Sequence, residues 1–163
     1  MSFLPLSDIQ VIDNDLVDSV VERALLSSRK RTNHNFHTLD EVYQRFLNVL
    51  TKGTYVGVHR HKADPKPETF LVLRGKVGIF IYDDFGKITN SYRLSSEGPN
   101  YGIDLRPGVW HNLVCLSEIA VCFEGKSGPY LVNTDKEFHP KYPGEGEKGW
   151  EQQLSTWESF FDS

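Results

Sequence analysis

The side chains best suited to chemistry in this sequence are four potential metal ligands between positions 59 and 111. His59 and His61 are separated by one residue, and on a strand two such side chains point to the same face. Glu68 opens the next expected strand, and His111 follows a Pro-Gly turn. Three neutral imidazoles and one carboxylate form a mixed nitrogen and oxygen site. They therefore predict one divalent transition metal ion, with Fe, Mn, Ni, Cu and Zn all open.

Two further side chains are candidates for catalysis beside such a metal. If residues 117–118 form a two-residue hairpin turn, Glu124 lies opposite His111 and points into the same cavity. Glu124 could then transfer protons or orient His111, while a solvent-facing carboxylate at a strand end is the alternative. Tyr55 and His59 are four residues apart on one expected strand, so their side chains should point to the same face. Tyr55 then either donates a hydrogen bond to a bound ligand or fills the core.

We assign no catalytic or metal-binding role to the two cysteines or to the remaining histidines. The same hairpin register places Cys115 and Cys122 inward and diagonal to each other, roughly 7–8 Å apart, which is poor for a disulfide. We therefore expect two buried, unreactive thiols. His34 and His139 are expected at the surface, and His37 near the barrel without an assigned role.

Basic side chains could ring the mouth of the cavity. Arg45, Arg60, Lys62 and Lys66 would suit a small polar or anionic partner such as a carboxylate or a sugar phosphate. A solvated charged rim is the alternative explanation.

These residues need a framework of short strands to bring them together. Residues 12–30 are expected to form an N-terminal amphipathic helix, because apolar residues recur at helical spacing from Asn14 to Ser28. From 42 to 130, runs rich in Val, Ile, Phe and Tyr alternate with turn residues, which indicates an all-β sandwich or barrel. The expected strands are Gln44–Leu50, Tyr55–His61, Thr69–Arg74, Lys76–Tyr82, Ile88–Leu94, Tyr101–Leu105, His111–Leu116 and Ile119–Glu124. Residues 131–163 are expected to form a surface loop, centred on Asp135–Gly149, and a short helix.

Length and composition fit one globular domain over residues 1–163, with 39 % hydrophobic and 25 % charged residues. The net charge of −4 gives no electrostatic reason to expect nucleic acid or an anionic membrane as partner. We find no apolar run long enough to span a bilayer and no recognisable signal peptide, so we expect a cytoplasmic protein.

The spacing of the candidate ligands resembles the first cupin motif. That motif consists of a glycine, five residues, His-x-His, a short gap, a glutamate, six residues and a second glycine. The matching residues are Gly53, His59, His61, Glu68 and Gly75. The gap before the glutamate is two residues longer than usual, and its two prolines suggest a loop at the barrel mouth.

The second cupin motif is matched in part. Pro107 and Gly108 are adjacent, the spacing from Gly108 to His111 fits, and Cys115 stands where the family has asparagine. That asparagine is not a metal ligand in the family, so the ligand set is intact. The resemblance implies a double-stranded β-helix, or jelly roll, that holds the metal on the four residues named first.

A wider resemblance covers residues 14–146, which are similar to the WbuC-type cupin-fold metalloproteins. It is carried by Lys30–Asn33, His37, Gln44–Arg45, His59–His61, Glu68–Gly75, Pro107–His111 and Phe123–Tyr130. That family is associated with bacterial surface-polysaccharide gene clusters and has no settled reaction. Cupins commonly dimerise through edge strands, so we expect a homodimer, with the apolar segment Phe3–Leu6 as a possible cover for an edge.

Three functions stay open on the sequence. The first is a metal-dependent enzyme acting on a small polar molecule such as a sugar or sugar nucleotide, as an isomerase, a hydrolase or an Fe(II) oxygenase. The second is a non-catalytic module that binds or senses a small molecule through the metal. The third is a structural metal that braces the barrel.

Overall fold

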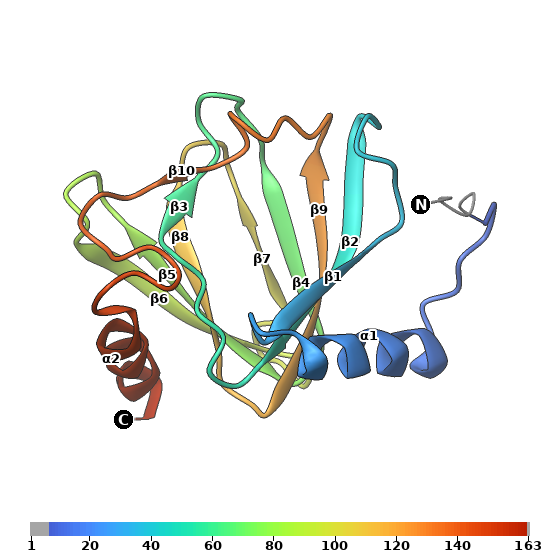
Figure 1. Ribbon diagram of the computed structural model, residues 1–163, viewed down its shortest axis with the longest axis horizontal. Helices are drawn as coiled ribbons and strands as arrows, with labels where there is room; N and C mark the ends of the chain where they lie inside the picture. Colours follow the sequence, from blue (N-terminus) through green and yellow to red (C-terminus); the bar gives the residue numbers. More distant parts are fainter. Residues whose placement is uncertain (1–6, 163) are drawn as a thin grey trace.

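The computed structural model describes residues 7–162, which fold into two facing antiparallel sheets with one helix before and one after them (Figure 1). Within these residues each sheet has five strands. Sheet A has the order β1-β2-β9-β4-β7, and sheet B has the order β10-β3-β8-β5-β6. This arrangement confirms the predicted jelly roll with its two helices. The elements are α1 (Asn14–Leu26), β1 (Arg31–Asn35), β2 (Tyr43–Thr51), β3 (His59–Arg60), β4 (Glu68–Arg74), β5 (Lys76–Tyr82), β6 (Ile88–Ser95), β7 (Gly102–Leu105), β8 (Trp110–Cys115), β9 (Ile119–Ser127), β10 (Glu137–Phe138) and α2 (Trp150–Asp162).

Most predicted strands are present, and β5 coincides with its prediction. Two regions differ. The strand predicted over Tyr55–His61 is reduced to the two residues of β3. Strand β1 was not predicted, because its residues Arg-Thr-Asn-His-Asn show no apolar alternation. It forms because its backbone pairs along β2, from Arg31 opposite Leu50 to Asn35 opposite Phe46.

Strands β8 and β9 do not form the expected hairpin. β8 pairs with β3 and β5 in sheet B, whereas β9 pairs with β2 and β4 in sheet A. The predicted register of His111 opposite Glu124 is therefore wrong. His111 lies opposite His59, and Glu124 lies opposite Phe46 and Phe70.

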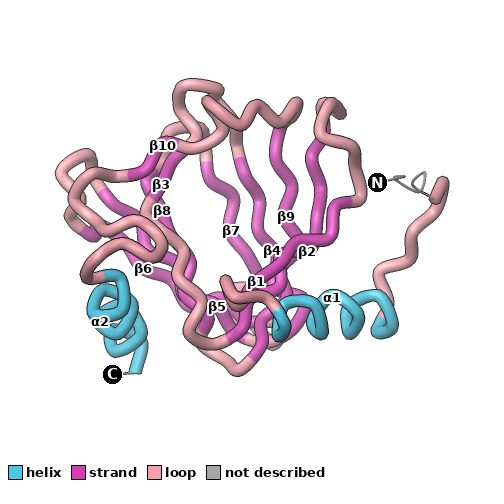
Figure 2. The backbone as a smooth tube through the Cα atoms, viewed as in Figure 1, coloured by secondary structure: helices cyan, strands magenta, loops and turns pink. Residues whose placement is uncertain are grey.

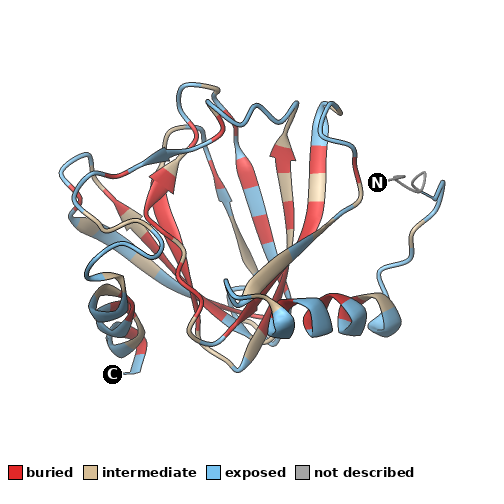
Figure 3. Cartoon of the chain, viewed as in Figure 1, coloured by how far each residue is buried: buried red, intermediate tan, exposed pale blue. Residues whose placement is uncertain are grey.

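An apolar core lies between the two sheets, and Figure 3 shows buried residues alternating with exposed ones along β4. Inward-facing residues alternate in this way because successive side chains on a strand point to opposite faces. Cys115 and Cys122 belong to this core and are buried and free, as predicted. The main core residues are Leu50, Phe70, Val72, Val77, Ile79, Leu94, Leu105, Leu113, Cys115, Ala120 and Cys122.

The two helices cover the outer faces of the sheets. The apolar stripe of α1 packs on sheet A, and the carboxyl group of Asp13 caps the helix by accepting from the Leu16 amide at 2.9 Å. Helix α2 packs on sheet B, where a Cβ on Gly78 would lie 2.4 Å from the ring of Phe161. The absence of a side chain at Gly78 therefore leaves room for the ring of Phe161. Neither described helix has the length and apolar character that crossing a membrane requires.

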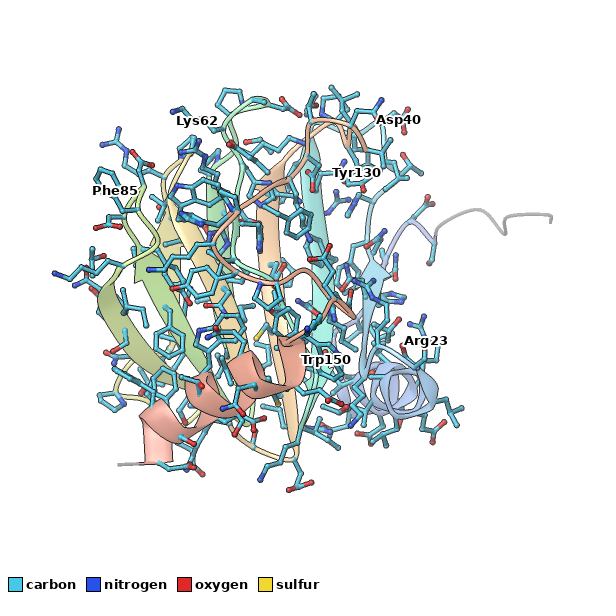
Figure 4. The ribbon with its side chains drawn as sticks, turned by 60° about the vertical axis from the view of Figure 1, so that its left-hand side comes forward. Arg23, Asp40, Lys62, Phe85, Tyr130 and Trp150 are labelled. Atoms are coloured by element: carbon cyan, nitrogen blue, oxygen red, sulfur yellow. The ribbon has the colours of Figure 1, made fainter. Side chains whose placement is uncertain are left out.

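Residues 128–136, the crossing segment, run from the end of β9 over the open end of the barrel to β10 (Figure 2). Figure 4 places Lys62 and Tyr130 towards this same end, away from helix α2. The predicted surface loop over Asp135–Gly149 is partly wrong, because Asp135 and His139 are buried. The expected edge cover, Phe3–Leu6, lies outside the described residues.

Candidate metal centre and its cavity

The four predicted ligands converge between the two sheets. His59 and His61 lie on β3 and directly after it, and His111 lies opposite His59 on β8. Glu68 reaches them from β4 in the other sheet. One ligand atom from each residue lies within 4.8 Å of all the others, and all four side chains are buried. The group has the size and composition to hold one metal ion.

Each imidazole is oriented by a backbone carbonyl through its Nδ1 atom. His59 Nδ1 lies 2.9 Å from the Gly57 oxygen, and His111 Nδ1 lies 2.9 Å from the Val109 oxygen. His61 Nδ1 contacts the Asp135 oxygen. A carbonyl can only accept, so Nδ1 carries a proton in each ring, and in the neutral form of the ring Nε2 has a free lone pair. This second hydrogen bond is what metal-binding histidines typically make.

The Nε2 lone pairs point at a carboxylate rather than at a donor. His61 Nε2 is 3.1 Å from Glu68 Oε1, and His111 Nε2 is 3.0 Å from Glu68 Oε2. With neutral rings these distances bring acceptors against acceptors, and Glu68 Oε2 and both Nε2 atoms are buried without a hydrogen-bond partner. Buried polar atoms are rarely left unpaired, so a cation between them fits this arrangement.

The charge states suit a metal as well. Burial alone raises the pKa of Glu68, but positive charge on the side of His111 and His61, carried by a ring proton or by a cation, outweighs burial and leaves the pKa well below the usual range. Burial, reinforced by His111 and Lys136, lowers the pKa of His59 well below its usual value. An ionised carboxylate and a neutral imidazole are the forms that bind metal.

Glu124 lines the same cavity from β9, so the predicted direction of its side chain agrees with the structure although the predicted pairing does not. Its Oε1 atom accepts from Asn48 Nδ2 at 2.9 Å. Burial, and next the charge of Glu68, raises the pKa of Glu124 to about 7. This carboxyl group can both hold and release a proton near neutral pH.

The structure places Tyr55 away from the cavity, which corrects its prediction as a catalytic group. Its hydroxyl donates to the Pro143 oxygen at 2.5 Å, and its ring stacks on Trp157 of α2. Tyr55 belongs to the core beneath α2. The prediction assumed that side chains alternate along a strand from Tyr55 to His59, but Tyr55 does not lie in a strand.

Asp135 connects the candidate metal ligands to the crossing segment, and no pattern in the sequence pointed to it. Its carbonyl orients His61, while its carboxylate lies 3.1 Å from Lys126 Nζ and 3.4 Å from Lys66 Nζ. Lys66 also donates to the Pro129 oxygen at 2.7 Å. All of these charged side chains are buried. The group therefore fixes the crossing segment against one metal ligand.

The basic residues predicted to ring the mouth are mostly engaged elsewhere. Arg45 and Arg60 each lie 2.8 Å from an acidic side chain, and Lys66 is only 2 % exposed. Lys62 remains exposed at the open end of the barrel (Figure 4). The cations that line the cavity are instead Arg29, Arg31, Lys126 and Lys136.

Of the other three histidines, one lines the cavity and two contact residues elsewhere in the fold. His139 is buried with its ring 4.7 Å from that of Trp110, so its prediction as a surface residue is wrong. His34 is partly buried and contacts Gln10. His37 is buried and lines the cavity, with its Nδ1 atom 2.8 Å from the Arg45 amide nitrogen.

The cavity beside the ligands has a volume of about 770 Å³ and is lined by residues of both sheets and of the crossing segment. Its size lies within the range of small-molecule sites. His59, Glu68 and His111 are on its wall, so a metal bound there is open to a ligand. Four protein donors leave coordination positions free on an octahedral ion.

Comparison with known proteins gives a family and a fold. The sequence model of the family described as "Domain of unknown function (DUF6016)" matches residues 12–94. No match was found among curated proteins.

Solved structures share the fold. The capsular polysaccharide assembling protein CapF from Staphylococcus aureus is 24 % identical, with a TM-score of 0.58 over 69 % of this chain and 32 % of that chain. CapF with the inhibitor 3-isopropenyl-tropolone is 25 % identical, with a TM-score of 0.57 and the same coverage. The Cnp3 cupin domain of Schizosaccharomyces pombe is 10 % identical, with a TM-score of 0.49 over 61 % of this chain and 66 % of that chain. This chain shares its two-sheet jelly-roll fold with part of CapF and spans about a third of the length of that protein.

Proposed function

This chain belongs to the DUF6016 family, and we propose that it is a divalent-metal-dependent enzyme acting on a small polar molecule such as a sugar or sugar nucleotide. We further propose that this activity serves surface-polysaccharide metabolism. The first proposal rests on the chemistry of the site, and the second on the similarity to CapF.

The observation that carries the proposal is the set of acceptors around Glu68. Three rings are fixed by backbone carbonyls so that their free nitrogens surround one buried carboxylate. No donor of the described residues completes this group. A divalent ion would satisfy all four ligands at once, and it would supply a Lewis acid that polarises a bound oxygen.

The solved structure of CapF with 3-isopropenyl-tropolone supports a ligand rich in oxygen. Tropolone carries a carbonyl beside a hydroxyl, and such a pair of oxygens is a bidentate ligand for hard and borderline metal ions. A sugar offers comparable neighbouring oxygens. A carbonyl or hydroxyl oxygen of the substrate would then bind to the metal that His59, His61, Glu68 and His111 would hold.

Glu124 is the group that we propose to move the proton. It shares the cavity with the metal ligands, and Asn48 holds its Oε1 atom in place. Its pKa of about 7 allows it to accept a proton from a carbon or hydroxyl beside a polarised oxygen and to return it. This favours isomerase or hydrolase chemistry over oxygen activation among the reactions considered.

The test is proton exchange followed by NMR in D₂O with metal-loaded protein and a panel of keto sugars, their phosphates and sugar nucleotides. We expect deuterium at a carbon next to a carbonyl, loss of exchange with EDTA, and at least about a hundredfold slower exchange in Glu124→Gln. Glu118→Gln, at an exposed turn, is the matched control and should retain activity. Metal-dependent binding without exchange would instead support the non-catalytic module.

A further inference from the structure

The wall of the cavity contributed by sheet A carries uncharged amides in adjacent strands. Asn33 of β1 lies directly opposite Asn48 of β2. Glu124 of β9 lies opposite Phe46, two residues from Asn48 on the same face of β2. Asn33, Asn48 and Glu124 all line the cavity whose other wall holds the histidines.

Asn48 is the most informative residue of this wall. Its Nδ2 atom donates to Glu124 Oε1 at 2.9 Å, which fixes the orientation of the amide. Its Oδ1 atom is buried and has no hydrogen-bond partner within residues 7–162. A buried acceptor without a donor is unfavourable, so this position favours a ligand that brings a donor.

Asn33 extends the same wall towards solvent. It lies on the edge strand β1 and is exposed, although it lines the cavity. No hydrogen bond of its side-chain amide is found among the described residues, so both its donor and its acceptor are available to a ligand. The neighbouring Asn35 is also exposed and lines the cavity. A ligand can therefore enter along β1.

The charges of the lining do not favour an anion at this wall. Arg29 and Arg31 are both paired with Glu145, at 2.8 and 2.7 Å. Lys126 is paired with Asp135. Lys136 of the crossing segment also lines the cavity, and its charge faces the carboxylates of Glu124, Asp135 and Glu68. The polar side chains that sheet A itself leaves to a ligand are chiefly amides and one carboxyl group. Groups that both donate and accept hydrogen bonds suit them, and hydroxyls have this property.

We propose that Asn33, Asn48 and Glu124 bind neighbouring hydroxyl groups of a sugar ring whose other oxygens reach the metal centre. The proposal rests on the function proposed above and deepens it by naming the residues that recognise the substrate. Asn48 Oδ1 accepts from one hydroxyl, and the Asn33 amide donates to or accepts from the next. The ring then lies between sheet A and the histidines, beside the proton-transfer group.

The test uses the full chain loaded with one equivalent of Zn²⁺, and saturation-transfer NMR with UDP-glucose, UDP-galactose, free glucose, free galactose and UDP. We expect saturation of sugar-ring protons for at least one hexose and none for UDP alone. Asn48→Leu should weaken that binding by about tenfold or more, and Asn33→Ala by about threefold to tenfold. Asn90→Ala, an exposed residue of β6, should bind as the wild type does.

Zinc affinity, measured by calorimetry in the same samples, separates the two proposals. Zinc binding without hexose binding, or hexose binding unchanged in both Asn33→Ala and Asn48→Leu, would overturn the hydroxyl-binding wall and leave the metal centre standing. Failure of the wild type to bind zinc would overturn the proposed function and this inference with it. Asn33 is exposed, so its variant keeps the test decisive if Asn48→Leu does not fold.

Discussion

Two groups of buried ionisable side chains meet at the open end of the barrel. In the group of Asp135, Lys66 and Lys126, each charge has an opposite charge within 3.4 Å, and Lys66 also donates to a carbonyl. In the group of Glu68 and its three histidines, acceptors face acceptors and three atoms stay unpaired. The Asp135 carbonyl joins the two groups through His61.

The difference shows where the chain completes its own chemistry and where it leaves room for a ligand. Burying charges is favourable only when partners and hydrogen bonds offset the loss of water. The Asp135 group meets this condition with its own residues. The Glu68 group would meet it if a cation were added, which is the arrangement that a metal-binding site requires.

The largest effect should come from breaking the complete group. Asp135→Ala leaves the buried Lys126 without its carboxylate and Lys66 with Asp64 alone, and we expect a loss of about 3–5 kcal/mol in the free energy of unfolding. Urea denaturation monitored by tryptophan fluorescence measures it. Asp18→Ala, which removes a surface pair with Arg74, should cost less than about 1 kcal/mol. Equal small losses in both variants would mean that the Asp135 group does not stabilise the barrel.

A substitution in the group of Glu68 and its three histidines should remove stabilisation by metal without lowering the stability of the metal-free chain. A saturating divalent ion, at about a thousand times its Kd, should stabilise the wild type by about 4 kcal/mol. In His111→Gln this gain should vanish, yet in EDTA the variant should be no less stable than the wild type, because an amide can donate to Glu68. Thermal unfolding with and without metal measures both effects. His34→Gln, on β1 outside the group, serves as the control and should keep the full gain.

Glu124 offers a smaller, pH-dependent test. Its folded pKa of about 7 lies above its ordinary value of 4.5, so the folded chain holds this proton more tightly than the unfolded chain. The stability that this contributes is present below about pH 4.5 and is lost as the pH rises through 7. In EDTA, Glu124→Gln should therefore exceed the wild type by on the order of 1–3 kcal/mol at pH 8 and match it at pH 4. A difference that does not change with pH would contradict this.

The smallest effect concerns Tyr55. Tyr55→Phe removes one hydrogen bond, to the Pro143 oxygen, and should cost about 1 kcal/mol of stability. Because the ring lies beneath α2 and not in the cavity, metal affinity and ligand binding should be unchanged. Calorimetry with Zn²⁺ checks this, and a weakened metal site in Tyr55→Phe would reopen a role in the cavity.

The sequence predicted that His59, His61, Glu68 and His111 would lie together, and local geometry accounts for part of that result. A one-residue spacing puts His59 and His61 on one side of an extended chain, and the motif glycines mark the turns around them. Gly75, for example, has a φ of +77°, and a Cβ there would lie 2.2 Å from the Ile119 oxygen. Such local constraints are visible in one sequence.

What the sequence did not predict depends on contacts between distant segments. The sheet partner of β9 was misassigned because a short turn at 116–118 can lead either into a hairpin or across to the other sheet. Strand β1 has no apolar pattern, so Asn33 went unnoticed as part of the cavity. Asp135 lies in a loop and meets His61 and Lys66 only after the chain has crossed the barrel.

X-ray absorption spectroscopy of the chain loaded with one equivalent of Zn²⁺ shows whether the three histidines and Glu68 bind the ion. We expect three imidazole nitrogens at about 2.0–2.1 Å together with carboxylate oxygen, and one imidazole fewer in His59→Ala. A spectrum with oxygen ligands alone, or one that His59→Ala leaves unchanged, would contradict this expectation.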